Sequence, residues 1–220
     1  MEKAQGSSYW LRVGIILVVT TMLYNVVEAV IALWAGVEAA SIALIEFGSN
    51  SVIELAAASV LIWRLRLEAR GADSDRVARA DLVVHRFVGL SFMALALYVL
   101  IQSVWMLWHQ EVPNVSYIGL LLATASLIIM PLVSFGKLRA ATEVGSRALR
   151  AEAKETLACS YLSFTLLLGL GANAALSWWW ADPVAALLMI PWLVKEGLEG
   201  LSGKEHEAES RVAPASVSSS

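Results

Sequence analysis

Charged residues are scarce in this sequence. Asp, Glu, Lys and Arg make up 16% of the 220 residues, whereas hydrophobic residues make up 58%. A soluble domain ordinarily has about a quarter of its residues charged, so the composition excludes that class. With 1 Cys, 5 Pro and 14 Gly, a disulfide scaffold, a collagen and a disordered Pro/Gly-rich chain are excluded as well. The net charge of −3 gives no reason to expect nucleic acid as a partner.

The motifs of common enzymatic chemistry are also missing. The sequence has no Gly-rich phosphate loop, no visible Ser/His/Asp set and no CxxC pair. An ATP-driven mechanism therefore has no site, and neither an enzyme nor a permanently bound cofactor is expected.

Long apolar runs dominate the chain instead, and the mean hydropathy is +0.67. A bilayer core about 30 Å thick requires roughly 20 apolar residues per helix. Backbone polar groups find no water in lipid, so each spanning segment must be helical. The expected spans are residues 11–35, 41–63, 87–108, 116–136, 156–176 and 182–201. The sequence predicts an all-α integral membrane protein with six transmembrane helices. Asp182 and Pro183 are expected as the N-cap and first residue of the sixth.

The basic residues determine the expected orientation. All 16 Lys and Arg fall in the two tails or in the stretches after the second and fourth spans, among them Lys137. By the positive-inside rule, both termini and these two connections face the cytoplasm. Glu152 and Lys154 lie near the same boundary and are expected to be solvated. Tryptophans gather at the opposite ends of the spans as an outer aromatic belt: Trp34, Trp105, Trp108, Trp178, Trp179 and Trp180.

The expected organisation has three parts. Residues 1–10 form a cytoplasmic N-terminal segment, residues 11–201 form the six-helix transmembrane domain, and residues 202–220 form a disordered, Ser-rich cytoplasmic tail. Residues 64–82 are expected as a polar loop. We place the protein in the lipid bilayer of a bacterial inner (plasma) membrane.

Polar residues recur at helical spacing inside two of the expected spans. An ionisable residue in a membrane helix costs at least about 2.5–3.5 kcal/mol, so it is a functional hypothesis by default. Residues four apart lie on one face of a helix. The two stripes are Glu46, Asn50 and Glu54 in the second span, and Glu155, Cys159 and Ser163 in the fifth.

Depth along the helices allows the two stripes to meet. At about 1.5 Å per residue, Glu54 and Cys159 each lie about 20 Å from the outer ends of their spans. Asn50 falls about 6 Å above this layer and Glu155 about 6 Å below it. Carboxylate, amide and thiolate donors suit Zn²⁺ and other first-row metals better than Mg²⁺ or Ca²⁺. The sequence therefore predicts a divalent-metal site, with zinc first and manganese, iron, cobalt or cadmium as alternatives.

Other interpretations of these residues stay open. Glu46 could equally line a water-filled outer vestibule. Cys159 alone could be a small buried apolar residue, and Asn50 could join two helices by hydrogen bonds. Asn25 and Glu28, in the first span, could line the pathway or support packing around the site, and we favour the supporting role.

Several stretches resemble the cation diffusion facilitator (cation efflux) superfamily. Residues 41–54 (SIALIEFGSNSVIE) are similar to the second helix of that family, and residues 151–163 (AEAKETLACSYLS) to its fifth. Residues 180–188 (WADPVAALL) and 194–197 (VKEG) are similar to the start and end of its sixth helix. The first span fits loosely, and the third and fourth fit by hydropathy only.

The resemblance implies a homodimer and metal–proton antiport that exports metal from the cytoplasm. It also implies that Asn50 and Glu54 face Glu155 and Cys159 in the transported-metal site. Asn50 and Glu155 stand where His or Asp is usual, and Cys159 stands where Asp is usual. The cytoplasmic C-terminal domain common in the family is not found after the sixth span, so a small membrane-domain-only branch is expected.

The sequence thus predicts proton-coupled efflux of a divalent transition metal by alternating access. Glu54 and Glu155 act as charged ligands and proton carriers, and Asn50 and Cys159 complete the shell. The pathway or supporting residues are Glu46, Asn25, Glu28 and Ser163. The alternatives are a non-transporting scaffold or regulatory dimer with a degenerate metal site, and a transporter of a small organic cation.

Overall fold

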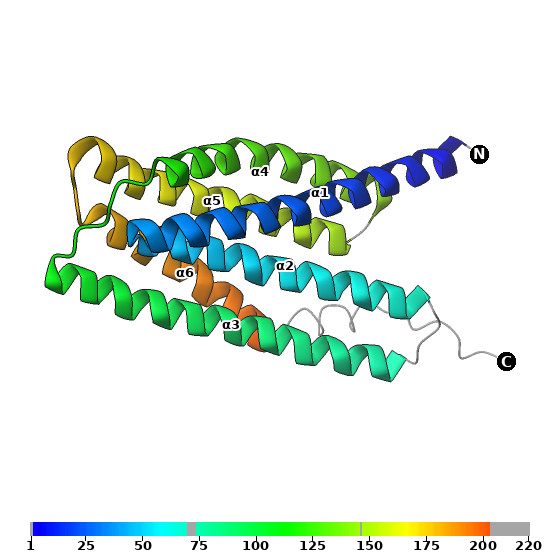
Figure 1. Ribbon diagram of the computed structural model, residues 1–220. Helices are drawn as coiled ribbons and strands as arrows, with labels where there is room; N and C mark the ends of the chain where they lie inside the picture. Colours follow the sequence, from blue (N-terminus) through cyan, green and yellow to red (C-terminus); the bar gives the residue numbers. More distant parts are fainter. Residues whose placement is uncertain (1, 70–73, 146, 203–220) are drawn as a thin grey trace.

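The described part of the chain folds into a bundle of six helices. The computed structural model describes residues 2–69, 74–145 and 147–202, and the regular secondary structure in these ranges is all α-helical. The helices are α1 (Glu2–Ala39), α2 (Ile42–Ala69), α3 (Ser74–His109), α4 (Tyr117–Val144), α5 (Arg147–Leu176) and α6 (Ala181–Ser202). Consecutive helices run in opposite directions, and α6 runs back towards the end at which α1 starts (Figure 1). The expected all-α class is confirmed.

Five of these six helices are long and apolar enough to cross a membrane. Their candidate spans are Arg12–Ala39, Ile42–Ser59, Arg86–His109, Tyr117–Val144 and Glu152–Leu176. The spans of α5 and α2 are 50% and 44% buried within the chain, whereas those of α1 and α3 are only 28% buried. Of these five spans, the two that carry the polar stripes are therefore the most enclosed by protein. The five apolar spans together show that the protein is integral to a membrane.

The sixth helix forms where it is expected but is less apolar than the others. Every stretch of 18 residues within α6 contains at least three charged side chains, drawn from Asp182, Lys195, Glu196 and Glu199. It packs against α3 and α5, so neighbouring helices cover much of its surface.

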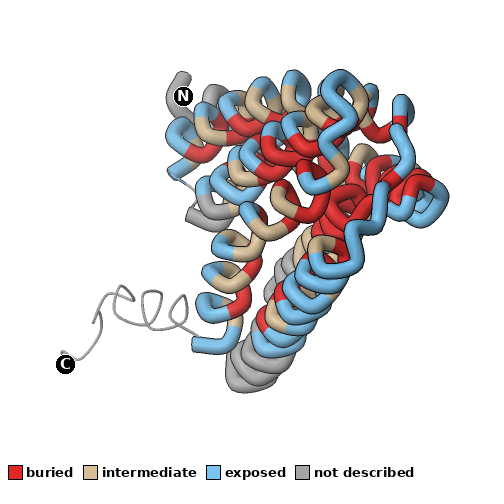
Figure 2. Tube along the Cα trace, turned by 90° about the vertical axis from the view of Figure 1, so that its left-hand side faces the viewer, coloured by how far each residue is buried: buried red, intermediate tan, exposed pale blue. Residues whose placement is uncertain are grey.

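The outside of the bundle is apolar, unlike that of a soluble protein. Large apolar side chains such as Ile16, Leu23 and Leu121 are exposed on the outside of the bundle. The interior holds an apolar core together with fully buried polar residues, Glu28 and Asn50 among them. Figure 2 shows the buried positions facing the inside of the bundle and the exposed ones facing outwards. This distribution suits lipid surroundings, where apolar side chains are the favourable surface.

Two expected connections are helical in the structure. The stretch 64–82 is helical at 64–69, where α2 continues, and at 74–82, where α3 begins. Likewise α4 continues past residue 136 to Val144, so Lys137 belongs to a helix and not to a loop. The expectation was wrong because hydropathy detects only the part of a helix in lipid, whereas Ala, Arg, Leu and Glu extend helices into water. Residues 70–73 and the expected tail at 203–220 lie outside the described residues.

Asp182 caps a different helix from the expected one. Helix α6 starts at Ala181, which places Asp182 inside its first turn. The Asp182 carboxylate accepts hydrogen bonds from the Ser41 hydroxyl group and from the backbone N–H of Ile42 (2.9 Å) and Ala43 (3.5 Å). These N–H groups belong to the first turn of α2, where they have no partner within the helix. Asp182 therefore joins the start of α6 to the start of α2.

Candidate metal centre

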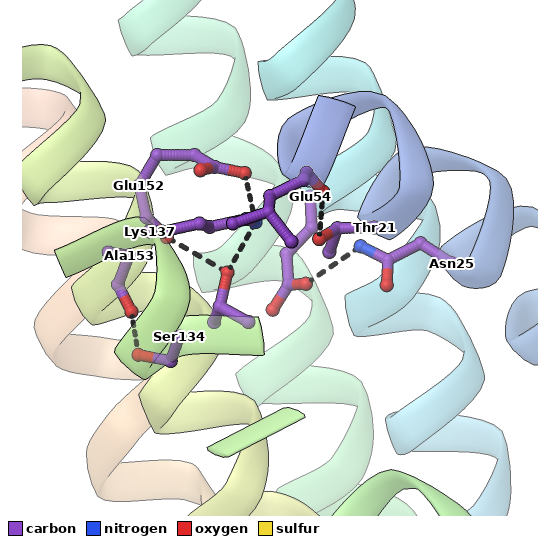
Figure 3. A network of polar contacts seen from close by, with 9 residues as sticks. Thr21, Asn25, Glu54, Ser134, Lys137, Glu152 and Ala153 are labelled. Atoms are coloured by element: carbon purple, nitrogen blue, oxygen red, sulfur yellow. Dashed lines mark hydrogen bonds and ion pairs between the residues drawn. The ribbon is translucent and has the colours of Figure 1, made fainter. Parts of the chain in front are cut away.

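A carboxylate held by two amides, that of the partly buried Glu54, lies between α1 and α2. Asn50 Nδ2, one turn earlier on α2, donates to Glu54 Oε1 at 2.7 Å, and Asn25 Nδ2 on α1 donates to Glu54 Oε2 at 3.1 Å. Figure 3 shows Asn25 reaching towards Glu54 from the neighbouring helix. The carbonyl oxygens of both asparagines are buried and accept no hydrogen bond within the described part of the chain. Two amide oxygens thus stand beside the carboxylate with free lone pairs.

Helix α5 brings a thiol to the same carboxylate. Cys159 is 1% exposed, and its thiol is within hydrogen-bonding reach of the Glu54 carboxyl group. Ser163, one turn further out on α5, is fully buried and donates to the Cys159 carbonyl oxygen at 2.8 Å. Helices α1, α2 and α5 therefore supply two amide oxygens, one carboxylate and one thiol in one place. This matches the layer that residue spacing predicts for Glu54 and Cys159.

A second carboxyl group lies close to this cluster on α1. Glu28 is fully buried and accepts hydrogen bonds from the hydroxyl groups of Ser51 on α2, at 2.8 Å, and Ser126 on α4. The Tyr24 and Ser126 hydroxyl groups are 2.7 Å apart, within hydrogen-bonding distance. Glu28 interacts electrostatically with Glu54. Its own hydrogen bonds are made to residues outside the cluster, and its supporting role stays a prediction.

Glu155 is not part of this cluster in the structure. Its side chain is exposed on the surface of the single chain, as is that of Lys154. The inward residue one turn before Thr156 is Glu152, whose side chain is only 13% exposed. The expectation that Glu152 is solvated was therefore wrong, because the inner face of α5 runs through residues 152, 156, 159 and 163. The role of Glu155 as a ligand stays a prediction.

Glu152 pairs with a lysine that lies inside the bundle. Lys137 is fully buried on α4, and its Nζ lies 2.7 Å from Glu152 Oε1 and donates to Thr156 Oγ1 at 3.0 Å. Glu152 Oε2 has no hydrogen-bond partner within the described residues. Figure 3 shows this group beside Glu54 and Asn25. The positive-inside count had placed Lys137 in a cytoplasmic loop. The sequence does contain a signal that Lys137 is buried. Ser126, Ser134 and Lys137 form a polar stripe at helical spacing, and all three lie on the buried face of α4.

Glu46, nearer the predicted outer end of α2, is enclosed by protein. Both of its carboxylate oxygens are buried and without a hydrogen-bond partner in the described residues. Its carboxyl group interacts electrostatically with that of Asp182. Glu28 accepts hydrogen bonds from two hydroxyl groups, whereas no described residue donates a hydrogen bond to the Glu46 carboxylate.

The donors at the centre include few anions. Within residues 2–69, 74–145 and 147–202, no group of three or more His, Cys, Asp or Glu side chains is arranged to hold a metal ion. A cation at this point would depend on the amide oxygens of Asn25 and Asn50 to complete its coordination around Glu54 and Cys159. Amide oxygens are neutral donors, so the cluster offers fewer negative charges than a site of carboxylates.

Comparison with known proteins identifies the family. The sequence profile of the cation efflux transmembrane domain matches residues 16–202, which is most of the chain. The chain belongs to the cation efflux family. The match runs through all six helices of this cation efflux domain, including α3 and α4, which resembled the family by hydropathy alone.

The chain is also similar to a longer protein that is named as a transporter. This cation efflux chain is 26% identical over 150 residues to the uncharacterized transporter sll1263 of Synechocystis sp.. The aligned region covers 67% of this chain and 48% of the relative. The chain therefore spans about half the length of that relative.

Proposed function

We propose that this cation efflux protein transports a divalent transition metal, with Glu54, Cys159, Asn50 and Asn25 as the ligands. The observation that carries the proposal is the pair of unpartnered, buried amide oxygens beside the Glu54 carboxylate and the Cys159 thiol. A buried polar oxygen without a partner costs about 1–3 kcal/mol, and a bound cation would satisfy both oxygens at once. Family membership supports a cation as the transported species.

The donor set favours a first-row metal over Mg²⁺ or Ca²⁺. Thiolate is a soft ligand that selects zinc and its neighbours, whereas Mg²⁺ and Ca²⁺ prefer oxygen ligands throughout. Zinc comes first in this proposal, with manganese, iron, cobalt and cadmium as alternatives. Glu155 enters the proposal as a further ligand only in a conformation that turns its side chain from the surface towards Cys159.

Proton coupling follows from the chemistry of the ligands. A carboxylate and a thiol bind metal in their deprotonated forms, so metal and protons compete for Glu54 and Cys159. Alternating exposure of such a site to the two sides of the membrane would exchange a metal ion for protons. We propose export from the cytoplasm by a homodimer, as the resemblance implies, in a bacterial inner membrane.

Flux into liposomes tests this function. Purified protein would be reconstituted around a metal-sensitive dye, and Zn²⁺, Mn²⁺, Fe²⁺, Co²⁺ and Cd²⁺ would be screened under an imposed pH gradient. The test variant is Glu54→Gln, which keeps the size of the side chain and removes its charge. Its matched control is Glu199→Gln, because Glu199 is a half-exposed residue near the end of α6.

The expected result is metal flux that depends on the pH gradient, survives in Glu199→Gln and falls to the level of empty liposomes in Glu54→Gln. No flux of any metal by folded protein would refute transport and favour a scaffold. Flux of an organic cation that Cys159→Ser leaves unchanged would instead favour the organic-cation alternative, since soft coordination would not be in use.

A further inference from the structure

We propose that Lys137 is a tethered cation that competes with the transported metal for the Glu54 site. Its ammonium group pairs with Glu152 while a metal ion is bound, and moves towards Glu54 when the metal leaves. This inference rests on the proposed metal site. It assigns to α4 a part in transport that neither the two polar stripes nor the family's ligand pattern includes.

The burial of Lys137 calls for an explanation. Lysine is almost never fully buried unless it is paired, and an intramembrane lysine is costly. Lys137 lies 20 residues into α4, about 30 Å from the predicted outer end of that helix. It therefore lies on the cytoplasmic side of Glu54, at the depth of the inner edge of a bilayer core about 30 Å thick, but its side chain is buried inside the bundle. A lysine placed only for membrane orientation would extend into water instead.

The ammonium group pairs with one carboxylate and interacts with a second at longer range. It contacts Glu152 on one side and interacts electrostatically with Glu54 and Cys159 on the other. Figure 3 shows the Lys137 side chain between Glu152 and Glu54. Its four-carbon stem is flexible, which allows the ammonium group to move from Glu152 towards Glu54. In the structure Lys137 is thus paired with Glu152 and acts on Glu54 at longer range.

The ion pair between Lys137 and Glu152 is only partly satisfied by hydrogen bonds. Only one oxygen of Glu152 contacts Lys137, and the other has no partner in the described residues. The third participant, Thr156, accepts from Lys137 while its own hydroxyl donates to the Glu152 carbonyl oxygen at 3.0 Å. A structural pair of charges ordinarily satisfies its remaining lone pairs with further hydrogen bonds. This pair leaves one oxygen unsatisfied and keeps the ammonium exchangeable.

A tethered cation would assist release of the metal. Metal departure leaves the partly buried Glu54 carboxylate without a counter-charge, which is unfavourable. Movement of the Lys137 ammonium group towards Glu54 would supply that charge. The same group opposes a bound metal ion by like-charge repulsion. Lys137 therefore weakens metal binding and speeds metal release.

Two variants with opposite expected effects test the proposal. Lys137→Met removes the charge and keeps an unbranched apolar stem. Glu152→Gln removes the anionic partner and frees the ammonium group to pair with Glu54. Zn²⁺ affinity of the purified full-length protein would be measured by calorimetry, and Co²⁺ binding by the thiolate charge-transfer absorption of Cys159. The matched control is Lys195→Met, since Lys195 is an exposed lysine on α6.

Lys137→Met is expected to tighten metal binding about tenfold and Glu152→Gln to weaken it about tenfold, the scale of one nearby unit charge in a protein interior. Lys195→Met should change nothing. The double variant Lys137→Met with Glu152→Gln has no ammonium group to compete for Glu54 and should bind as tightly as Lys137→Met. In liposomes, Lys137→Met should transport more slowly although it binds more tightly.

A pair that only fastens α4 to α5 would give another pattern. Both single variants would then lower the unfolding temperature and shift metal affinity in the same direction or not at all, and the inference would be overturned. If either single variant does not fold, unchanged affinity in the double variant overturns it equally. Absence of metal binding to the unsubstituted protein would instead refute the proposed function.

Discussion

Single polar residues inside this bundle are held by partners on other helices. Glu28 on α1 accepts from Ser51 on α2 and from Ser126 on α4, and Asp182 on α6 accepts from the start of α2. Each of these carboxyl groups is fully buried. Loss of one member of such a set leaves the others without a partner, at a cost that exceeds the net value of the hydrogen bond. These positions therefore stabilise particular helix pairs.

Asp182 is expected to be needed for its acceptor oxygens more than for its charge. Asn is about as good a cap as Asp, whereas loss of a capping side chain to Ala costs about 0.5–2 kcal/mol. Asp182→Ala should therefore lower the unfolding temperature clearly, and Asp182→Asn less, because the single Asn oxygen still accepts from Ile42 and Ala43, its NH2 group can donate to the Ser41 hydroxyl oxygen, and repulsion with Glu46 is relieved. Thermal unfolding in detergent measures both. Equal losses in the two variants would show that one acceptor oxygen is not enough and that the full carboxylate is required.

Glu46 is expected to limit stability. Its two buried oxygens have no hydrogen-bond partner in the described residues, and burial of such a group costs about 1–3 kcal/mol. Glu46→Met, with an apolar side chain of similar length, should raise the free energy of unfolding by an amount in that range. If Glu46 also takes part in transport, metal flux through the more stable variant should fall. A lower unfolding temperature for Glu46→Met would contradict this account.

Residue spacing predicted that Glu54 and Cys159 lie at the same depth. It did not predict which face of α5 points into the bundle. Glu54 and Cys159 come together, as their depths required. The stripe on α5 was less well defined, because residues three and four apart both lie near one another on a helix. Spacing alone favoured Glu155 as its inner member, whereas the enclosed residue is Glu152. Whether Glu152 or Glu155 faces the interior depends on how α5 is rotated about its axis against α4. The sequence of α5 alone does not determine this rotation.

At the scale of helices, hydropathy predicted the number and order of the elements but not their ends. Lipid requires an apolar surface, so the spans are visible in the sequence. Beyond the bilayer the same helix is polar and resembles a loop, as residues 64–69 of α2 do. Helices α1, α3 and α5 are each followed by a non-glycine residue with left-handed backbone. These residues are Ala40, Gln110 and Ser177, with φ of 53°, 54° and 54°. Glycine is the usual signal for such an end.

The contact between α3 and α6 is expected to depend on the missing side chain of Gly89. A Cβ atom there would lie 2.8 Å from the Gly197 carbonyl oxygen and 2.8 Å from the Leu201 backbone nitrogen. Backbone atoms cannot move aside as a flexible side chain can, so Gly89→Ala should destabilise the protein by about 1–3 kcal/mol. Thermal unfolding of the purified variant in detergent would measure the loss.

Gly171 supplies the matched control. A Cβ atom at this helical glycine of α5 meets nothing within 4 Å. Gly171→Ala should therefore raise the free energy of unfolding by about 0.5–1 kcal/mol through helix propensity alone. Similar behaviour of Gly89→Ala and Gly171→Ala would mean that the close approach of α3 to α6 is not required.

At the scale of the whole molecule, one polar region joins four helices. Asn25 and Glu28 on α1, Glu54 on α2, Lys137 on α4 and Cys159 on α5 interact in pairs by hydrogen bonds or electrostatically. The surrounding core is apolar. A cation at Glu54 would therefore hold several helices in one arrangement, and its effect on stability should extend to unfolding of the whole bundle.

Metal binding is accordingly expected to raise the unfolding temperature in a manner that depends on pH. A ligand at about 100 times its dissociation constant adds roughly 2.7 kcal/mol to the free energy of unfolding. Protons compete with metal for Glu54 and Cys159, so the stabilisation by Zn²⁺ should be present near neutral pH and shrink as the pH falls. Glu54→Gln should remove both the stabilisation and its pH dependence, whereas Glu199→Gln should retain them. Stabilisation by Zn²⁺ that is equal at neutral and acidic pH, or that persists in Glu54→Gln, would place the metal elsewhere on the protein.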